Sequence, residues 1–223
     1  HGAFRYERGN VALATEKAVQ IDFSYAFHFD DLEIIVNPFY NRIRDYIYLS
    51  NSGELVEDLP LFEYEQADYA QFYGVDFGFH YHPHEAHWLH VESSLSSVFA
   101  EDMSRNPLPL IPQTRLNNQI RIDFDGDRKV QFKNIMVQYL YFFKQNRLGV
   151  FETGTADYHL LNLGATLAVN TSKPFIISFG VRNLLNTTYI DHLAGLKQIG
   201  IPNPGINFYL GFKVELNHNL KTK

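Results

Sequence analysis

Strict alternation of apolar and polar residues is the feature that most limits how this chain can fold. Near the C-terminal end, every second position is apolar, namely Phe208, Leu210, Phe212, Val214 and Leu216. The positions between them include Gly211, Lys213 and Glu215. Because successive side chains of a β-strand point to opposite faces, the pattern predicts a strand with one apolar and one polar face.

The same alternation recurs along the whole chain and predicts nine strands. Their approximate ranges are Thr15–His28, Leu32–Leu49, Tyr69–Tyr81, Trp88–Ala100, Thr114–Phe124, Lys129–Arg147, Tyr158–Val169, Phe175–Arg182 and Asn207–Leu216. Short turns join them at one end, as at Asp125–Asp127, where Asp-Gly is a strong hairpin signal. Longer connections join them at the other end, including Ser50–Asp68 and the proline-rich Asn106–Pro112. Irregular alternation at Ile135–Val137 predicts a β-bulge.

These strands favour an all-β, antiparallel up-and-down transmembrane β-barrel of the outer-membrane type. Several exceed a dozen residues, which is longer than usual for a soluble sandwich. The short turns would lie in the periplasm and the long loops outside the cell. A soluble β-sandwich is the alternative, because it also has regular strands separated by turns. Nine strands leave open edges, which hydrocarbon does not tolerate, so we expect further strands before residue 1.

Composition narrows the class of protein further. No apolar run approaches the roughly 20 residues of a spanning helix, which excludes a helical membrane protein. The 19 Phe and 14 Tyr fit the aromatic girdles of a membrane barrel. Cysteine is absent and the net charge is −6, which argue against a disulfide, a thiolate metal site and a nucleic-acid partner. The chain opens at His1 with neither Met nor a signal peptide, so we interpret it as part of a longer precursor.

Several motifs point to one family. Gly180–Tyr189 contains Asn-Leu-Leu-Asn followed by Tyr, and Gly200–Phe208 leads into the last strand. The other matching segments, in chain order, are Phe4–Asn10 with Leu13 and Glu16, Phe39–Ile43, Tyr46–Tyr48, Tyr69–Asp76, and Gln145–Arg147 with Glu152, Thr155 and Tyr158. In these segments the chain resembles the C-terminal part of TonB-dependent outer-membrane receptors.

That resemblance implies a 22-stranded barrel filled by a plug, of which residues 1–223 would form about the last nine strands. The plug and the segment that contacts TonB would lie in the family's N-terminal region, which this sequence lacks. Members usually end on an aromatic residue, whereas here Asn217–Lys223 follows the last strand. Within the family, His1–Gly9 and Arg42–Tyr48 look most similar to receptors for zinc and related metals.

Half of the ten histidines gather around one predicted turn, at His80, His82, His84, His87 and His90. A turn centred near Glu85 would place His80 opposite His90, both pointing into the lumen, with Glu92 one step away. Imidazoles beside a carboxylate suit Zn or Cu, and cross-strand neighbours lie close enough to share an ion. His80, His90 and Glu92 are therefore candidate metal ligands at the periplasmic end. The simpler interpretation is a solvated turn in which histidine is an ordinary polar residue.

Candidate substrate-binding residues lie at the opposite, extracellular end. The connection Ser50–Asp68 is acidic without Lys or Arg, and Glu54, Glu57 and Asp58 would concentrate cations by their field. By family resemblance, substrate is captured on this side, which adds His1 and the neighbouring Asp191 and His192. The simpler interpretation is a solvated acidic loop with no particular ligand.

We therefore predict a TonB-dependent receptor in the bacterial outer membrane that takes up a scarce nutrient, with a metal ion or metal complex as the expected class. Zinc, copper, haem and a ferric siderophore all stay open as substrates, and no intrinsic cofactor is expected. The expected partners are the TonB complex, outer-membrane lipid and the nutrient. We expect no enzymatic activity, because no nucleophile, base and orienting residue occur at recognisable spacing. The alternatives are a soluble β-sandwich binding module and a different outer-membrane barrel, such as a barrel enzyme.

Overall fold

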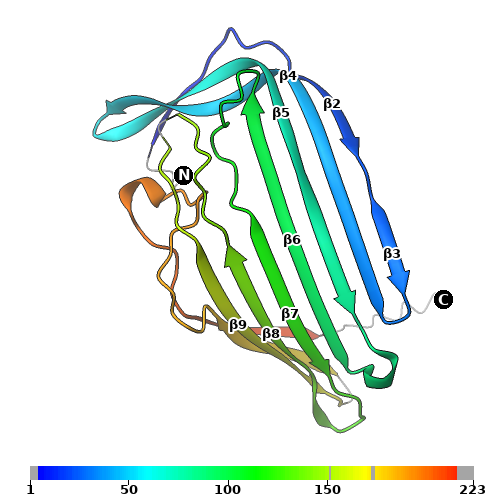
Figure 1. The fold of residues 1–223 in the computed structure, drawn as a ribbon. Coiled ribbons are helices and arrows are strands. Elements are labelled where there is room, and N and C mark those ends of the chain that lie inside the picture. The colour runs from blue at the N-terminus through cyan, green and yellow to red at the C-terminus, as the bar shows by residue number, and fades with distance from the viewer. Residues whose placement is uncertain (1–4, 151, 172–173, 215–223) are drawn as a thin grey trace, which may run out of the picture.

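The computed structural model describes residues 5–150, 152–171 and 174–214, which form one curved sheet (Figure 1). Its strands are β1 (Tyr6–Arg8), β2 (Lys17–Asp22), β3 (Tyr25–Phe29), β4 (Leu32–Val56), β5 (Leu59–Tyr81), β6 (Leu89–Asp102), β7 (Arg115–Asp123), β8 (Val130–Phe142), β9 (Tyr158–Val169), β10 (Phe175–Arg182) and β11 (Asn207–Val214). Two 3₁₀ turns, His84–Ala86 and Lys197–Ile199, complete the regular structure of this part of the chain.

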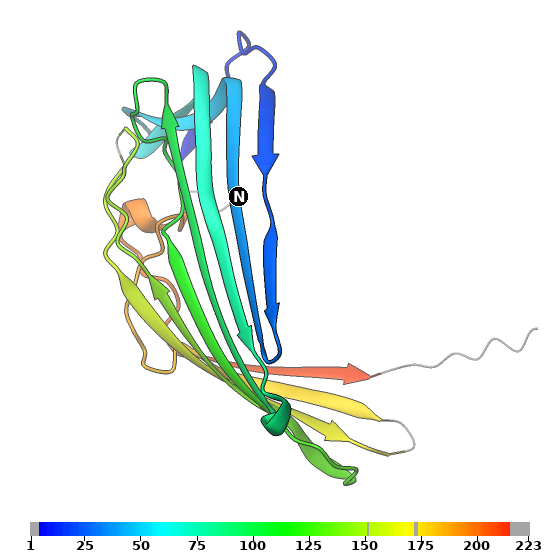
Figure 2. The ribbon, with the colours of Figure 1, turned by 45° about the vertical axis from the view of Figure 1, so that its right-hand side comes forward.

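The strands follow one another across the sheet in chain order. From β4 to β11 each strand pairs antiparallel with the next one, while β2 and β3 both pair with β4. The short β1 alone pairs parallel, with the start of β5. Figure 2 shows that the sheet curves strongly, so that β2 and β4 run in a different direction from β10 and β11. This single up-and-down sheet confirms the predicted fold class and is not the two packed layers of a β-sandwich.

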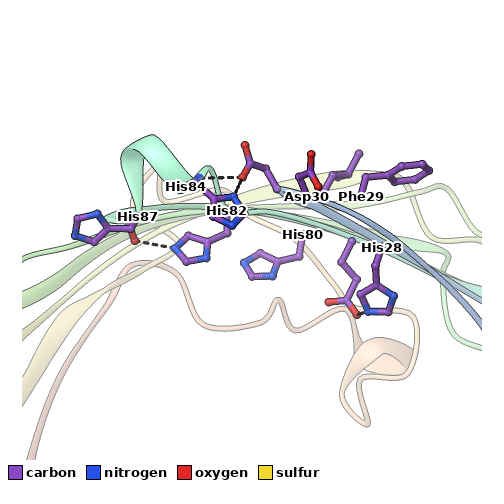
Figure 3. A pocket seen from close by; sticks show the side chains of 10 residues that line it. His28, Phe29, Asp30, His80, His82, His84 and His87 are labelled. Carbon is purple, nitrogen blue, oxygen red and sulfur yellow. Dashed lines mark hydrogen bonds and ion pairs between the residues drawn. The ribbon is translucent and has the colours of Figure 1, made fainter.

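Pairing between strands separates the side chains into two continuous faces. One face is apolar, as in the row of directly opposite residues Tyr25, Val36, Phe77, Leu95, Leu116 and Tyr141. The other face is largely polar and is covered near the long-loop end by the β10–β11 connection, whose Asp191 shares a pocket with Asp76 and Arg115. This loop lies on the concave side of the arched sheet (Figure 3), so the apolar face is convex.

The first predicted strand, Thr15–His28, is wrong as one continuous element, because it is divided into β2 and β3. The two halves keep one register, with Asp22 opposite Phe39 and Tyr25 opposite Val36. Between them, Pro38 of β4 accepts a hydrogen bond from the backbone N–H of Phe23 at 3.1 Å. Proline has no N–H to return, so the ladder is interrupted there.

The predicted long connection Ser50–Asp68 is also wrong. Residues of β4 and β5 stay paired through this stretch up to Val56 and Leu59, and only Glu57 and Asp58 form the turn. Both have positive φ, 49° and 63°, as a two-residue type I′ hairpin requires. At about 3.3 Å per residue, the 25 residues of β4 span about 80 Å, far more than a bilayer's apolar band needs.

Two smaller predictions fail around β8, which ends at Phe142 and not at Arg147. The irregularity expected at Ile135–Val137 lies instead between Phe132 and Asn134. Beyond β8 the chain forms a loop with one isolated bridge, Gln145 to Thr155. The stripe of β11 is described as far as Val214, so Leu216 lies outside the described residues, as does His1.

The hydrophobic core of the described residues lies at the loop-covered end of the concave face. Ala70 and Ala100 pack there with Leu108 and Ile111 of the β6–β7 connection, and Phe72 lies against them. The proline-rich connection is a loop, as predicted, and it folds back onto the sheet. No helix in the described part of the chain is both long and apolar enough to cross a membrane.

Candidate functional site

A continuous row of polar side chains crosses the concave face of the sheet. Successive members lie directly opposite one another on neighbouring strands from β3 to β9, in the order His28, Glu33, His80, Glu92, Gln119, Gln138 and Asn162. Neighbours bond at several points: His28 pairs with Glu33 at 2.8 Å, and Asn162 donates to Gln138 at 2.9 Å. The row gives this face ion-pairing and hydrogen-bonding groups where the convex face carries hydrocarbon.

Three histidines stack at the short-turn end of this face. His80 lies opposite Glu92, and not opposite His90 as predicted, because the turn is centred on Ala86. The ring of His82 instead lies 4.1 Å from that of His90 between centroids, and Nε2 of His80 lies 3.3 Å from Nδ1 of His90. The sequence pattern therefore brought His80 and His90 together but missed His82.

The carboxylates around this stack also differ from the expected arrangement. Glu92 lies beside Gln119, at 3.4 Å, while Asp123 pairs with Nε2 of His90 at 3.1 Å. Among the residues that the structure describes, no group of three or more His, Cys, Asp or Glu has a metal-binding arrangement. The three imidazoles of the stack therefore contact one another.

A pocket of about 570 Å³ opens beside the histidines (Figure 3). His28, His80 and His82 point to the same side of the sheet in this view. On the turn itself, His84 bonds through both its backbone N–H and its ring to Asp31. These hydrogen bonds lower the pKa of the Asp31 carboxyl below its ordinary value. His84 therefore connects the β5–β6 turn to the β3–β4 turn. It does not join the histidine stack, although its even position matches those of His80 and His82.

The acidic residues predicted to gather cations lie at the tip of the β4–β5 hairpin. Glu54, Glu57 and Asp58 are all exposed. Glu57 accepts a hydrogen bond from the hydroxyl of Tyr6 at 2.5 Å. Nearby, Glu63 pairs with Arg8 at 2.6 Å. The N-terminal segment thus offsets part of the negative charge of this hairpin, which its own sequence could not reveal.

His192 lies inside the folded loops and is only 4% exposed. Its Nδ1 lies within hydrogen-bond distance of Oγ1 of Thr155, at 2.8 Å, and of Nζ of Lys197, at 3.0 Å. Its backbone N–H donates to Gln113 at 3.3 Å. His192 therefore joins the β6–β7, β8–β9 and β10–β11 connections at one point.

The electrostatics of this cluster keep the imidazole neutral. Burial is the largest cause that lowers the pKa of His192, and the nearby ammonium of Lys197 is the next largest. Its Nε2 has no hydrogen-bond partner among the described residues and lies 3.8 Å from Oε1 of Glu152. Burial likewise lowers the pKa of Lys197, which donates to the carbonyl of Thr153 at 2.6 Å. The arrangement joins loops and is closed to solvent.

Asp191, next to His192, has a different environment. One of its carboxylate oxygens accepts a hydrogen bond from the hydroxyl of Tyr158 at 2.9 Å. It also lines a pocket of about 420 Å³ over the concave face, together with Asp76 and Arg115. Of the two adjacent residues predicted to capture substrate, Asp191 therefore faces a cavity and His192 does not.

The comparisons with known proteins agree with this geometry. The chain matches the family "TonB dependent receptor-like, beta-barrel" over residues 1–184. It is similar to the copper transporter OprC, at 19% identity and a TM-score of 0.72, covering 92% of this chain and 33% of that one. It is also similar to the FrpB iron transporter from Neisseria meningitidis, at 12% identity and a TM-score of 0.63, covering 95% and 33%. A variant of the ferric enterobactin receptor PfeA from Pseudomonas aeruginosa, solved with enterobactin, gives 17% identity and a TM-score of 0.63, covering 95% and 34%.

A curved antiparallel sheet, apolar on its convex face and polar on its concave face, defines part of the wall of an outer-membrane β-barrel. The chain belongs to the TonB-dependent receptor family. This family consists of outer-membrane transporters and not of enzymes, so the predicted class and location are confirmed. The chain spans about a third of the length of the solved structures that it matches.

Proposed function

We propose that this chain is the C-terminal part of the barrel of a receptor that actively imports a metal ion or a metal complex. The observation that carries the proposal is the polar row on the concave face, because that face would line the lumen through which a hydrophilic substrate passes. The apolar stripe Phe208, Leu210, Phe212 and Val214, continued in the sequence by Leu216, would face lipid.

In this proposal a longer receptor supplies the remaining strands, the plug and the segment that contacts TonB. The similar solved chains are about three times as long, which supports a role as one section of such a receptor. TonB, driven from the inner membrane, would displace the plug, while this chain provides wall and loops. The isolated section would neither bind its substrate tightly nor transport it.

The substrate class rests on ligand chemistry and on the relatives. OprC is a copper transporter, FrpB an iron transporter, and PfeA binds enterobactin. This chain offers imidazole and carboxylate but no thiolate, which suits zinc or copper as bare ions. Haem and ferric siderophores are the alternatives, since aromatic and polar loop residues also bind larger complexes.

We assign the first encounter with a cation to the hairpin tip and the loops. Glu54 and Asp58 are exposed and have no cationic partner among the described residues, so their field acts outward. Glu57 would contribute less because Tyr6 bonds to it. Asp191 would act further in, at the concave pocket, and His192 would hold the loops in place. His1 stays in the proposed set from its sequence position only.

A second cation site is proposed at the periplasmic end, on His80, His90 and Glu92. The 3.3 Å contact between the two imidazoles supports it, because their ring nitrogens already face each other and an ion could bind between them. A small rotation of Glu92, directly opposite His80, would bring a carboxylate to the pair. Zinc titrated into the complete receptor should then bind at least tenfold more weakly after His80→Ala or His90→Ala.

Binding measurements on the complete receptor test the assignment of substrate. Zinc, copper and ferric enterobactin are titrated separately into purified receptor, and the same titrations are repeated with Glu54→Gln/Asp58→Asn. We expect the double variant to slow cation association several-fold without slowing the association of ferric enterobactin, which is an anion. His159→Ala, on the convex face, is the matched histidine control. Failure of the wild-type receptor to bind either bare ion would refute a bare metal ion as substrate.

A further inference from the structure

We propose that the convex face, near its extracellular end, binds the phosphate groups of an anionic lipid of the outer leaflet. The site is a group of five cations that we call the rim patch: Lys17, Arg42, Arg44, Arg105 and Arg147. They come from β2, β4 and the β6–β7 and β8–β9 connections; strand pairing brings the first three together, and the last two line one pocket. The proposal depends on the outer-membrane location and not on the imported substrate.

The height of the rim patch matches that of lipid headgroups. Tyr40, Tyr73 and Phe99 lie opposite one another in a row across β4, β5 and β6, and the last two rings lie 5.6 Å apart between centroids. Aromatic rows of this kind mark the membrane interface of barrels. Below the row, toward Leu32 and Tyr81, the convex-facing side chains of β4 and β5 are apolar over eight residues of strand, or about 26 Å. Arg42 lies one residue pair above it, where lipid phosphates are found.

Strand pairing leaves two cations of the patch facing each other. Lys17 of β2 lies directly opposite Arg44 of β4, and Arg42 is the next residue on the same face. Like charges directly opposite one another destabilise a sheet. Among the residues that the structure describes, the one carboxylate within ion-pair distance of this group is Asp45, 3.6 Å from Arg44. The guanidinium of Arg42 lies 4.5 Å from the ring centre of Tyr69. A bound anion would remove the repulsion.

The other two cations line a pocket of about 600 Å³ on the same face. Arg105 and Arg147 share it with Asn146, Gln71, Tyr73 and Glu101, and the Glu101 carboxylate is already bonded to Gln71 and Arg147. Guanidinium groups bind phosphate oxygens in pairs, and an amide supplies a further donor. The pocket has the volume and the donors for a sugar- or glycerol-linked phosphate.

The nearby carboxylates offset Arg147 but leave other cations of the patch unpaired in the described part of the chain. Glu101 is buried, and its two oxygens accept hydrogen bonds from Gln71 and Arg147, each at 2.8 Å. Asp102 accepts its hydrogen bonds from the turn at Ser104 and Asn106. Arg42 and Arg105 have no carboxylate within ion-pair distance among the residues that the structure describes. These two side chains are therefore available to an added anion.

A lipid fits this surface better than a free anion does. The pocket of Arg105 reaches Tyr73, and a second pocket, of about 220 Å³, joins Arg42 to Tyr40. Both pockets therefore open onto the aromatic row and the apolar surface beneath it. A ligand with phosphate above and acyl chains below would cover both at once. Inorganic phosphate would contact the cations alone.

Lipid binding to the complete receptor in nonionic detergent tests the proposal. The probes are diphosphorylated lipid A, its monophosphorylated form, phosphatidylcholine and inorganic phosphate, with bound lipid counted by native mass spectrometry. We expect lipid A to bind best, and Arg42→Gln/Arg105→Gln to weaken it at least tenfold. Neither substitution leaves a carboxylate without its partner, so the receptor should still fold.

Two controls separate this result from simpler ones. Arg128→Gln/Lys129→Gln removes the same two charges from the opposite end of the sheet, in the β7–β8 turn, and should bind lipid A as wild type does. Arg42→Lys/Arg105→Lys should restore part of the affinity. Unchanged lipid A binding by the Arg42→Gln/Arg105→Gln variant would overturn the proposal. Inorganic phosphate displacing lipid A at equal concentration would also overturn it, because the patch would then be a general anion site.

Discussion

Oγ1 of Thr155 lies 2.8 Å from Nδ1 of His192, and this contact links two long connections at the extracellular end of the sheet. Both residues are buried, and Gln113 of a third connection accepts the backbone N–H of His192. The loops over the concave face are therefore one hydrogen-bonded layer, with His192 at its centre. His192, a residue predicted to meet substrate, bonds to each of the loops around it.

Replacing His192 should loosen this layer. His192→Ala leaves the hydroxyl of Thr155 and the ammonium of Lys197 without their acceptor in a buried site. We expect a loss of about 2–4 kcal/mol in the stability of the loop layer. Hydrogen exchange in the β8–β9 and β10–β11 connections measures it directly. His159→Ala, on the sheet's convex face, should leave this exchange unchanged, and equal exchange in both variants would contradict the role of His192.

The same cluster predicts a pH dependence. Folding lowers the pKa of His192, through burial and then through Lys197, so the unfolded chain takes up the proton first. The stabilisation is therefore present above the unfolded-state pKa of about 6.5 and is lost as the pH falls through the folded-state value. Thermal unfolding of wild type and His192→Gln, followed between about pH 7.5 and 4.5, measures the difference. Parallel curves for the two proteins would rule out His192 as the titrating group.

The Asn-Leu-Leu-Asn turn predicts a specific order of variants. Asn183 has φ of 52°, and its side chain both accepts from the N–H of Thr187 at 2.8 Å and donates to its carbonyl at 2.9 Å. Asn183→Ala loses both bonds and adds strain, costing about 2–4 kcal/mol. Asn183→Gly relieves the strain only, and Asn183→Asp keeps the acceptor. Urea unfolding should rank Ala as the least stable of the three, and any other least stable variant would disagree with the turn geometry.

Arginine substitutions on β11 test which face meets lipid. Phe212 belongs to the apolar stripe, and we expect Phe212→Arg to cost about 2–4 kcal/mol in a bilayer. Gly211 points to the concave face, where an added Cβ meets no atom closer than 3.8 Å, so Gly211→Arg should be tolerated. Folding of the complete receptor into liposomes, followed by heat-modified gel mobility, compares the two. A greater loss for Gly211→Arg would reverse the assigned faces.

Much of the fold could be predicted because period-2 alternation depends only on neighbouring residues. The bounds of β9, Tyr158–Val169, were predicted without error. The failures arose from partners across the sheet: Pro38 divides the first predicted strand, and the polar stretch after Leu49 stays paired because β5 faces it. Neither effect can be seen within the strand concerned.

The candidate site was less predictable for a related reason. The turn between β5 and β6 is centred one residue later than predicted. Glu92, and not His90, therefore lies opposite His80, and the ring of His82 stacks on that of His90. Burial of His192 depends on three connections that are distant in sequence. The two asparagines of the Asn183–Asn186 turn are the exception, because their positive φ, 52° and 51°, is what asparagine tolerates well. In this turn, the residue type in the motif is the one that the backbone conformation requires.

The most direct test of the account is TonB-dependent metal accumulation by cells that produce the complete receptor. Cells starved of zinc, copper and iron are given each metal or ferric enterobactin, and cell-associated metal is measured by mass spectrometry with and without functional TonB. The account predicts that one of these substrates accumulates several-fold more when both the receptor and TonB are present. Equal accumulation of every substrate in cells with and without TonB would contradict it.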